Sequence, residues 1–127
     1  MLAIAMVAAV VAAVAHVLFF VLESMLFQRP KVWRRFGVAS QHDADAIRPM
    51  ALNQGFYNLF LALGGMAGVI AVGLGYRVAG VTLIAFVAAC MLGAGLVLVI
   101  TGGSKFSRAA TIQAVPPLAT LLTLPLA

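Results

Sequence analysis

A cluster of hydrogen-bonding side chains interrupts an otherwise hydrophobic stretch of the chain, in the run from Asn53 to Asn58 (NQGFYN). Its Asn, Gln and Tyr side chains can all donate and accept hydrogen bonds. An unsatisfied polar group in hydrocarbon costs on the order of several kcal/mol. The cluster must therefore either form a packed internal polar network or bind a ligand.

Helical spacing divides this cluster into two pairs of side chains. Asn53 and Tyr57 are four residues apart, as are Gln54 and Asn58, and residues at this separation are neighbours on a helix surface. Gly55, which has no side chain, leaves one face of the helix open to a close neighbour. The pattern predicts that the cluster contacts other helices or a ligand.

Three further polar residues lie within hydrophobic segments, where ionisable groups are functional candidates. His16 and Glu23 are seven residues apart, so they project from nearly the same face of a helix and form a candidate ionisable pair. Gln113 lies a few residues inside the last hydrophobic segment. We expect these residues to join the Asn53–Asn58 cluster in one ligand-binding site.

Four hydrophobic segments must position these residues, at about 2–27, 51–74, 78–100 and 109–126. The chain of 127 residues is 65% hydrophobic and 9% charged, with a mean hydropathy of +1.15, and a membrane span needs about 20 residues. The first segment lacks a basic start and is followed by positive charge, so we expect it to be retained rather than cleaved. The sequence predicts one all-α domain, 1–127: a polytopic membrane protein with an antiparallel four-helix transmembrane bundle.

The basic residues predict how the bundle is oriented. Seven of the eight Lys and Arg residues fall in two connections, and Arg77 alone falls between the second and third segments. Because positive charge is retained on the inner side of the membrane, loops 28–50 and 101–108 are predicted to be cytoplasmic and both termini to face outward. The clustering of this charge points to anionic lipid and not to nucleic acid.

This orientation brings the polar residues to a common depth. At 1.5 Å per residue, His16 lies about 9 Å above the inner end of its helix, and Asn58 lies about 10 Å inside the membrane. Gln113 is at a similar level, and Glu23 is close to the cytoplasmic interface. The polar set therefore predicts a pocket in the cytoplasmic half of the bundle, whereas the outer half is almost wholly apolar.

The sequence gives no sign of a metal site. His42, Asp43 and Asp45 are close together in a polar loop, but this spacing defines no coordination geometry and is typical of a solvated surface. A lone Cys90 in an apolar run is expected to be a small hydrophobic residue. Nucleotide-binding and haem motifs are also lacking, and the cofactor is left unknown.

Several residues predict where helices begin, end or pack. We expect Pro30 to end the first helix, Ser40 to cap a short helix, and Pro49 to lie near the first turn of the second membrane helix. Pro116-Pro117 predicts a kink in the last helix, which either improves packing or opens a cavity beside Gln113. Gly64 and Gly68 form a GxxxG pattern that is expected to serve packing within the chain.

The chain resembles the small bacterial membrane proteins catalogued as domain of unknown function 1304. The resemblance rests on His16 and Glu23, on Phe36-Gly37, on the NQGFYN run, and on Gln113 with Pro116. Members often have a tryptophan near the end of the first helix, where this chain has Phe27. The resemblance implies a four-helix protein of the inner membrane and no assigned activity.

Three functions fit these observations. The first is an inner-membrane protein whose pocket binds a small amphipathic molecule such as a lipid, quinone or metabolite. Tyr57 beside His16 could then support proton transfer, so whether the protein is an enzyme stays open. The second is a small proton-coupled transporter, and the third is an accessory or scaffold subunit with a homo-oligomeric or membrane partner. For the first, the site residues are His16, Glu23, Asn53, Gln54, Tyr57, Asn58 and Gln113.

Overall fold

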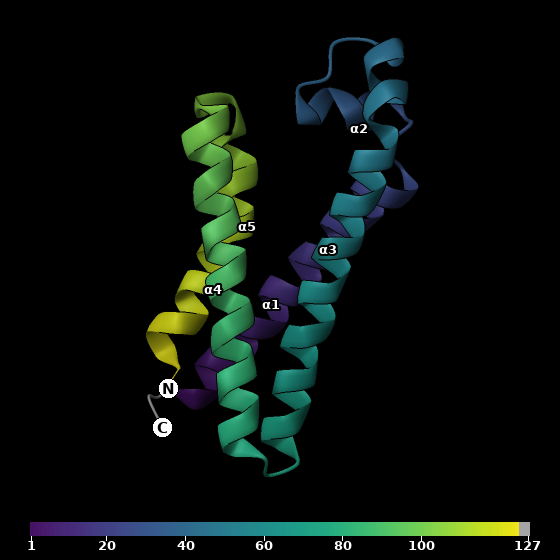
Figure 1. Ribbon diagram of the computed structural model, residues 1–127. Helices are drawn as coiled ribbons and strands as arrows, with labels where there is room; N and C mark the ends of the chain where they lie inside the picture. Colours follow the sequence, from purple (N-terminus) through teal and green to yellow (C-terminus); the bar gives the residue numbers. More distant parts are fainter. Residues whose placement is uncertain (125–127) are drawn as a thin grey trace.

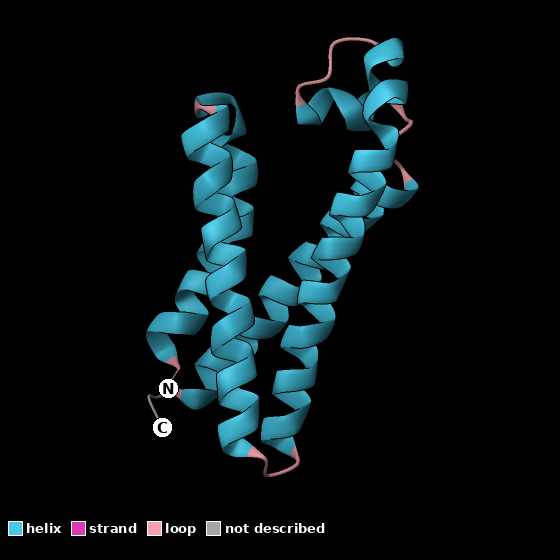
Figure 2. Ribbon diagram, in the orientation of Figure 1, coloured by secondary structure: helices cyan, strands magenta, loops and turns pink. Residues whose placement is uncertain are grey.

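A computed structural model describes residues 1–124, and within them all regular structure is helical (Figure 2). The main helices are α1 (Leu2–Phe20), α3 (Gln41–Gly73), α4 (Arg77–Gly102) and α5 (Ser107–Thr123). Shorter turns connect them: a π-helical turn (Val21–Met25), α2 (Pro30–Trp33), and 3₁₀ turns at Arg34–Phe36 and Ser104–Phe106. The all-α fold class is as predicted.

The first hydrophobic segment ends differently from the prediction. The α-helix stops at Phe20 and continues as the π-helical turn only to Met25, where the N–H of Leu26 donates to the carbonyl of Val21 at 3.0 Å. The helix therefore ends before the predicted residue 27. Pro30 does not end it, and instead takes the first position of α2, where its missing N–H removes no helical hydrogen bond.

The second long helix begins ten residues earlier than the predicted 51. Ser40 is its N-cap, and the Ser40 Oγ accepts a hydrogen bond from the N–H of Asp43 at 3.1 Å. Pro49 lies well inside α3 and not in its first turn, so the expected position was wrong. The predicted loop 28–50 is consequently replaced by α2, a 3₁₀ turn and the start of α3.

The four long helices pack in a ring, because α1 contacts α3 and α5, and α4 contacts the same two helices. Small residues allow the closest approach. A Cβ built at Gly68 would lie 3.0 Å from the carbonyl oxygen of Gly80, and one at Gly64 would lie 3.1 Å from a methyl group of Val87. The GxxxG residues thus pack against α4 within the chain. Gly95 likewise packs against Ala114 of α5, 2.9 Å from its Cβ.

Three helices are long and apolar enough to cross a membrane: Leu2–Met25, Gln41–Gly73 and Arg77–Gly102. The third of these exceeds the predicted 78–100 by a few residues. α5 has 17 residues and is about 26 Å long at 1.5 Å per residue. It begins before the predicted residue 109, and the predicted end at 126 lies outside the described residues. The chain thus has the long apolar helices of a membrane-embedded protein.

The two pairs of helices in the bundle are not parallel to each other. Figure 1 shows that the pair α1–α3 and the pair α4–α5 lie close together near the turn between α3 and α4, and diverge toward the end that carries α2. The diverging end holds the last residues of α1 and α4 and the first residues of α3 and α5. It is also the end near most of the polar residues singled out in the sequence.

The close contact between the π-helical turn and α3 gives a test of the packing. A Cβ at Gly55 would overlap the Oγ of Ser24 and lie 3.0 Å from the backbone nitrogen of Ser24. We expect Gly55→Ala to lower the free energy of unfolding by about 1–3 kcal/mol through overpacking. Gly93→Ala is the matched control, since nothing lies within 4 Å of a Cβ there. Unfolding in detergent measures both, and equal stability of the two variants would contradict the packing.

Candidate functional site

A cavity of about 900 Å³ lies between the two helix pairs at the diverging end. Its polar lining comes from the π-helical turn, from α3, α4 and α5, and from both 3₁₀ turns: Glu23, Arg35, Gln54, Asn58, Thr101, Lys105, Arg108 and Gln113. Its apolar lining consists of Leu18, Phe19, Leu22, Phe36, Ala94, Val97, Leu98, Phe106, Ala109 and Ile112. The cavity therefore combines apolar walls with a small set of polar and charged groups.

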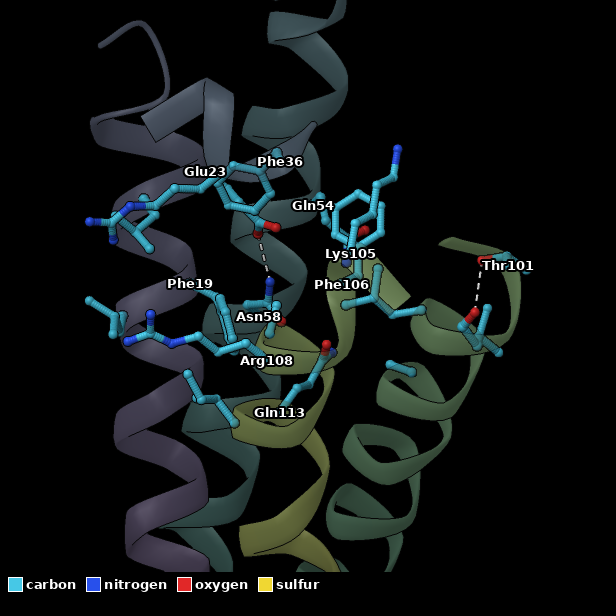
Figure 3. Close-up of a pocket in the computed structure, with 18 residues that line it drawn as sticks. Phe19, Glu23, Phe36, Gln54, Asn58, Thr101, Lys105, Phe106, Arg108 and Gln113 are labelled. Atoms are coloured by element: carbon cyan, nitrogen blue, oxygen red, sulfur yellow. Dashed lines mark hydrogen bonds between the residues drawn. The ribbon is translucent and has the colours of Figure 1, made fainter. Parts of the chain in front are cut away.

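The π-helical turn presents Glu23 to the cavity. A π-turn adds one residue to a helical turn and often marks a functional site. The Nδ2 of Asn58 on α3 donates a hydrogen bond to the Glu23 carboxylate at 2.7 Å (Figure 3). One residue further on, the Oγ of Ser24 donates to the carbonyl of Leu52 at 2.9 Å. These two hydrogen bonds hold the turn against α3, with Glu23 at the cavity surface.

Two further amides face the cavity from different helices. Gln54 precedes Asn58 by one turn on α3, and Gln113 lies on α5, where Figure 3 shows it across the cavity from Glu23. Among the side-chain hydrogen bonds formed within residues 1–124, none involves the amide of Gln54 or Gln113. Both amides are therefore available to a molecule in the cavity.

Four of the seven predicted site residues line this cavity, and three do not. Glu23, Gln54, Asn58 and Gln113 are brought together from three helices. Asn53 and Tyr57 lie on a different face of α3: both are exposed, and Tyr57 has 57% of its surface accessible. His16 is the third predicted site residue that does not line the cavity.

His16 is fully buried in α1, and its Nδ1 lies 2.8 Å from the carbonyl oxygen of Ala12. Because a carbonyl can only accept, Nδ1 carries a proton, and Nε2 has no partner within residues 1–124. The Phe19 ring, which does line the cavity, lies edge-on to the imidazole at 5.9 Å between centroids. His16 thus packs behind the cavity wall, apart from the exposed Tyr57, and its expected pairing with Glu23 is replaced by the Asn58–Glu23 bond.

The sequence interpretation did not select the three cations that line the cavity. Arg35 comes from the 3₁₀ turn after α2, Lys105 from the turn before α5, and Arg108 from the start of α5. They were interpreted as markers of membrane orientation and of contact with anionic lipid. For Arg108, helical spacing was a signal that the sequence contained. Ile112 is four residues later, so the two side chains share one face of α5, and both line the cavity.

The Phe106 ring lines the cavity at the end near the connecting turns. Phe106 packs tightly on Gly102 of α4, and its Cζ would lie 3.2 Å from a Cβ built at Gly37. Gly37 has a φ of 77°, which favours glycine, and it belongs to the connection before α3. Phe106 therefore bridges the two diverging helix pairs at the rim of the cavity (Figure 3).

The chemistry available here is that of binding. One carboxylate, three amides, one hydroxyl and three cations can orient a polar group, and the apolar walls can hold a hydrocarbon. Within residues 1–124 no group of three or more His, Cys, Asp or Glu side chains converges as a metal site. Cys90 is a free, partly buried thiol on α4 and does not line the cavity.

Comparison with known proteins gives one match. The family model described as "Protein of unknown function (DUF1304)" matches residues 10–125. That range includes all seven predicted site residues and every residue that lines the cavity. No match was found among curated proteins or among solved structures.

The Asn58–Glu23 bond can be tested by a double-mutant cycle. We expect Asn58→Ala and Glu23→Ala to show a coupling of about 1 kcal/mol in the free energy of unfolding, because each variant removes the same hydrogen bond. Unfolding equilibria in mixed micelles measure the cycle. The control cycle pairs Glu23→Ala with Asn53→Ala, two residues on different faces. Coupling no larger than in this control would show that the bond is not formed.

Proposed function

Since this chain belongs to the DUF1304 family of proteins of unknown function, its role has to be argued from its own residues, and we propose that it binds a small amphipathic molecule in the membrane. The binding site is the cavity between the α1–α3 and α4–α5 pairs. The observation that carries this proposal is that the amides of Gln54 and Gln113, on the wall of a large cavity, form no side-chain hydrogen bond with any part of the chain that the structure describes.

A purely structural polar network would leave a different pattern. Polar side chains that crosslink membrane helices bond to one another, because hydrocarbon offers them no other partner. Here Asn58 bonds to Glu23, whereas Gln54 and Gln113 form no side-chain hydrogen bond within residues 1–124. A ligand or ordered water that occupies the cavity would satisfy them. This favours binding over helix crosslinking as the reason for the polar set.

The size and lining of the cavity support an amphipathic ligand. Small-molecule sites enclose roughly 300–1,000 Å³ and are mostly apolar, with a few polar groups that orient the ligand. This cavity, at about 900 Å³, is near the upper end of that range. Its lining includes Phe19, Leu98 and Ile112 beside the amides. A molecule with both a polar group and a hydrocarbon part would match both kinds of wall.

We further propose that the protein lies in the bacterial inner membrane, that α5 is a fourth span, and that both termini face outward. α5 packs against both α1 and α4, which could each cross the membrane. Seven of the eight Lys and Arg residues belong to the diverging end or its connections, and Arg77 belongs to the opposite turn. The positive-inside rule then makes the diverging end cytoplasmic, with the cavity in that half.

Filling the cavity should exclude the ligand. Ala94→Trp places a large ring in the apolar wall, and we expect it to abolish a bound small molecule that native mass spectrometry detects on wild-type protein extracted in mild detergent. Ala79→Trp, at an exposed position on the same helix, is the matched control and should retain the adduct.

Substitutions on the two faces of α3 sharpen this experiment. Loss of the adduct in Asn58→Leu, with retention in Asn53→Leu, would agree with a site on the cavity face. An adduct that survives in both Ala94→Trp and Asn58→Leu would contradict the proposed site. Wild-type protein with no adduct and an unchanged thermal unfolding midpoint in lipid extract would contradict ligand binding altogether.

The orientation has its own test. In a Cys90→Ser background, a membrane-impermeant maleimide should label Tyr76→Cys in intact cells, and Ala39→Cys only after permeabilisation. Both residues are exposed, so unequal labelling reports the side of the membrane. Alkaline phosphatase fused after the last residue should be active, since it folds outside the cytoplasm. An inactive fusion together with external Tyr76→Cys would show that α5 does not cross.

A further inference from the structure

Three basic residues line the cavity from separate parts of the chain. Arg35 belongs to the 3₁₀ turn after α2, Lys105 to the turn before α5, and Arg108 to the first turns of α5. In Figure 3 Arg108 lies at the level of Asn58 and extends from α5 toward α1. The cavity thus collects positive charge from both of the diverging helix pairs.

Few acidic side chains are available to pair with these cations. The chain has three acidic residues, and each carboxylate takes a hydrogen bond from a neutral side chain. Glu23 accepts from Asn58 at 2.7 Å, Asp43 from Ser40 at 2.8 Å, and Asp45 from Gln41 at 2.9 Å. The ammonium group of Lys105 instead lies 5.1 Å from the centre of the Phe106 ring. Glu23 is the one carboxylate among the cavity residues, beside three cations.

We infer that the ligand is an amphiphile with an anionic headgroup, a phosphate or a carboxylate. Arg35, Lys105 and Arg108 bind this headgroup at the diverging end of the bundle. This inference rests on the proposed binding function and names the ligand's chemical class. Three cations beside a single carboxylate give the cavity lining an excess of positive charge, which favours an anion, and Arg and Lys form charge-assisted hydrogen bonds with both of these groups.

Apolar lining residues continue from the diverging end toward the centre of the bundle, where they could contact the hydrocarbon chain of the ligand. On α4, Ala94 and Leu98 lie successively before Thr101, which is next to the end of the helix. On α5, Ile112 follows Arg108 by one turn toward the centre of the bundle. A headgroup among the cations therefore places its chain along these residues. Gln113, which is also deeper than Arg108, would contact the ligand near the junction of its polar and apolar parts.

Amphiphiles that share a chain and differ in the headgroup test the inference. Purified wild-type protein in one non-ionic detergent is titrated with hexadecyl phosphate, palmitate and hexadecanol, and binding is read by native mass spectrometry. We expect at least one anion to bind about tenfold or more tightly than the alcohol, a difference that corresponds to one charge-assisted contact. The order of the two anions then identifies the headgroup.

Variants locate the charge preference. Lys105→Gln and Arg108→Gln should each weaken binding of the preferred anion by about tenfold and leave hexadecanol binding unchanged. Arg77→Gln, which removes the same charge at the opposite end, is the control and should bind as wild type. Arg108→Lys keeps the charge and should restore most of the affinity, which separates loss of charge from misfolding.

Other outcomes overturn the inference in distinguishable ways. Equal binding of all three amphiphiles would reject the anionic headgroup and leave the proposed binding function standing. Binding of none of them would count against both. Inorganic phosphate that competes as well as hexadecyl phosphate would indicate a site for free anions and not for amphiphiles. Undiminished anion binding in both Gln variants would show that the preference arises elsewhere.

Discussion

The close packing of the π-helical turn against α3 is the contact on which the rest of the site depends. Gly55 has no side chain, so the backbone of Ser24 can approach α3 closely enough for its hydroxyl to bond to Leu52. The same approach brings Glu23 within 2.7 Å of Asn58. A carboxylate beside apolar cavity walls is stabilised by a hydrogen-bond donor, and this packing supplies one without drawing on the other helices.

The C-terminal end of α1 leads into the π-helical turn, which packs closely on α3. At this end α1 therefore stays with α3 and diverges from α4 and α5. The two helix pairs meet near the turn between α3 and α4, where Gly68 and Gly80 allow the backbones to touch, and they diverge at the other end. Phe106 bridges the rim against Gly37. The cavity is therefore a consequence of unequal packing along the bundle, tight where small residues lie and open where the polar and basic residues lie.

Much of the fold could be predicted from composition and spacing. Apolar segments long enough to span a bilayer predicted the helices, since the backbone in hydrocarbon must satisfy its own hydrogen bonds. The boundaries were less accurate: the prediction began the second helix at about 51, whereas α3 begins at Gln41. Pro49 was taken as a sign of a helix start, but a helix whose neighbouring contacts compensate can carry a proline in its interior.

For the candidate site, the sequence by itself determined which residue types were present and at what height along each helix they lie, because helical rise converts residue number into height. It could not decide which face of each helix turns inward. The pairs Asn53–Tyr57 and Gln54–Asn58 have identical spacing, yet only Gln54 and Asn58 line the cavity. The rotation of α3 against the π-helical turn makes that choice, through the missing side chain of Gly55. The same tertiary packing places His16 behind Phe19 and gathers Arg35, Lys105 and Arg108 around one cavity, since contacts between distant segments are absent from any local pattern.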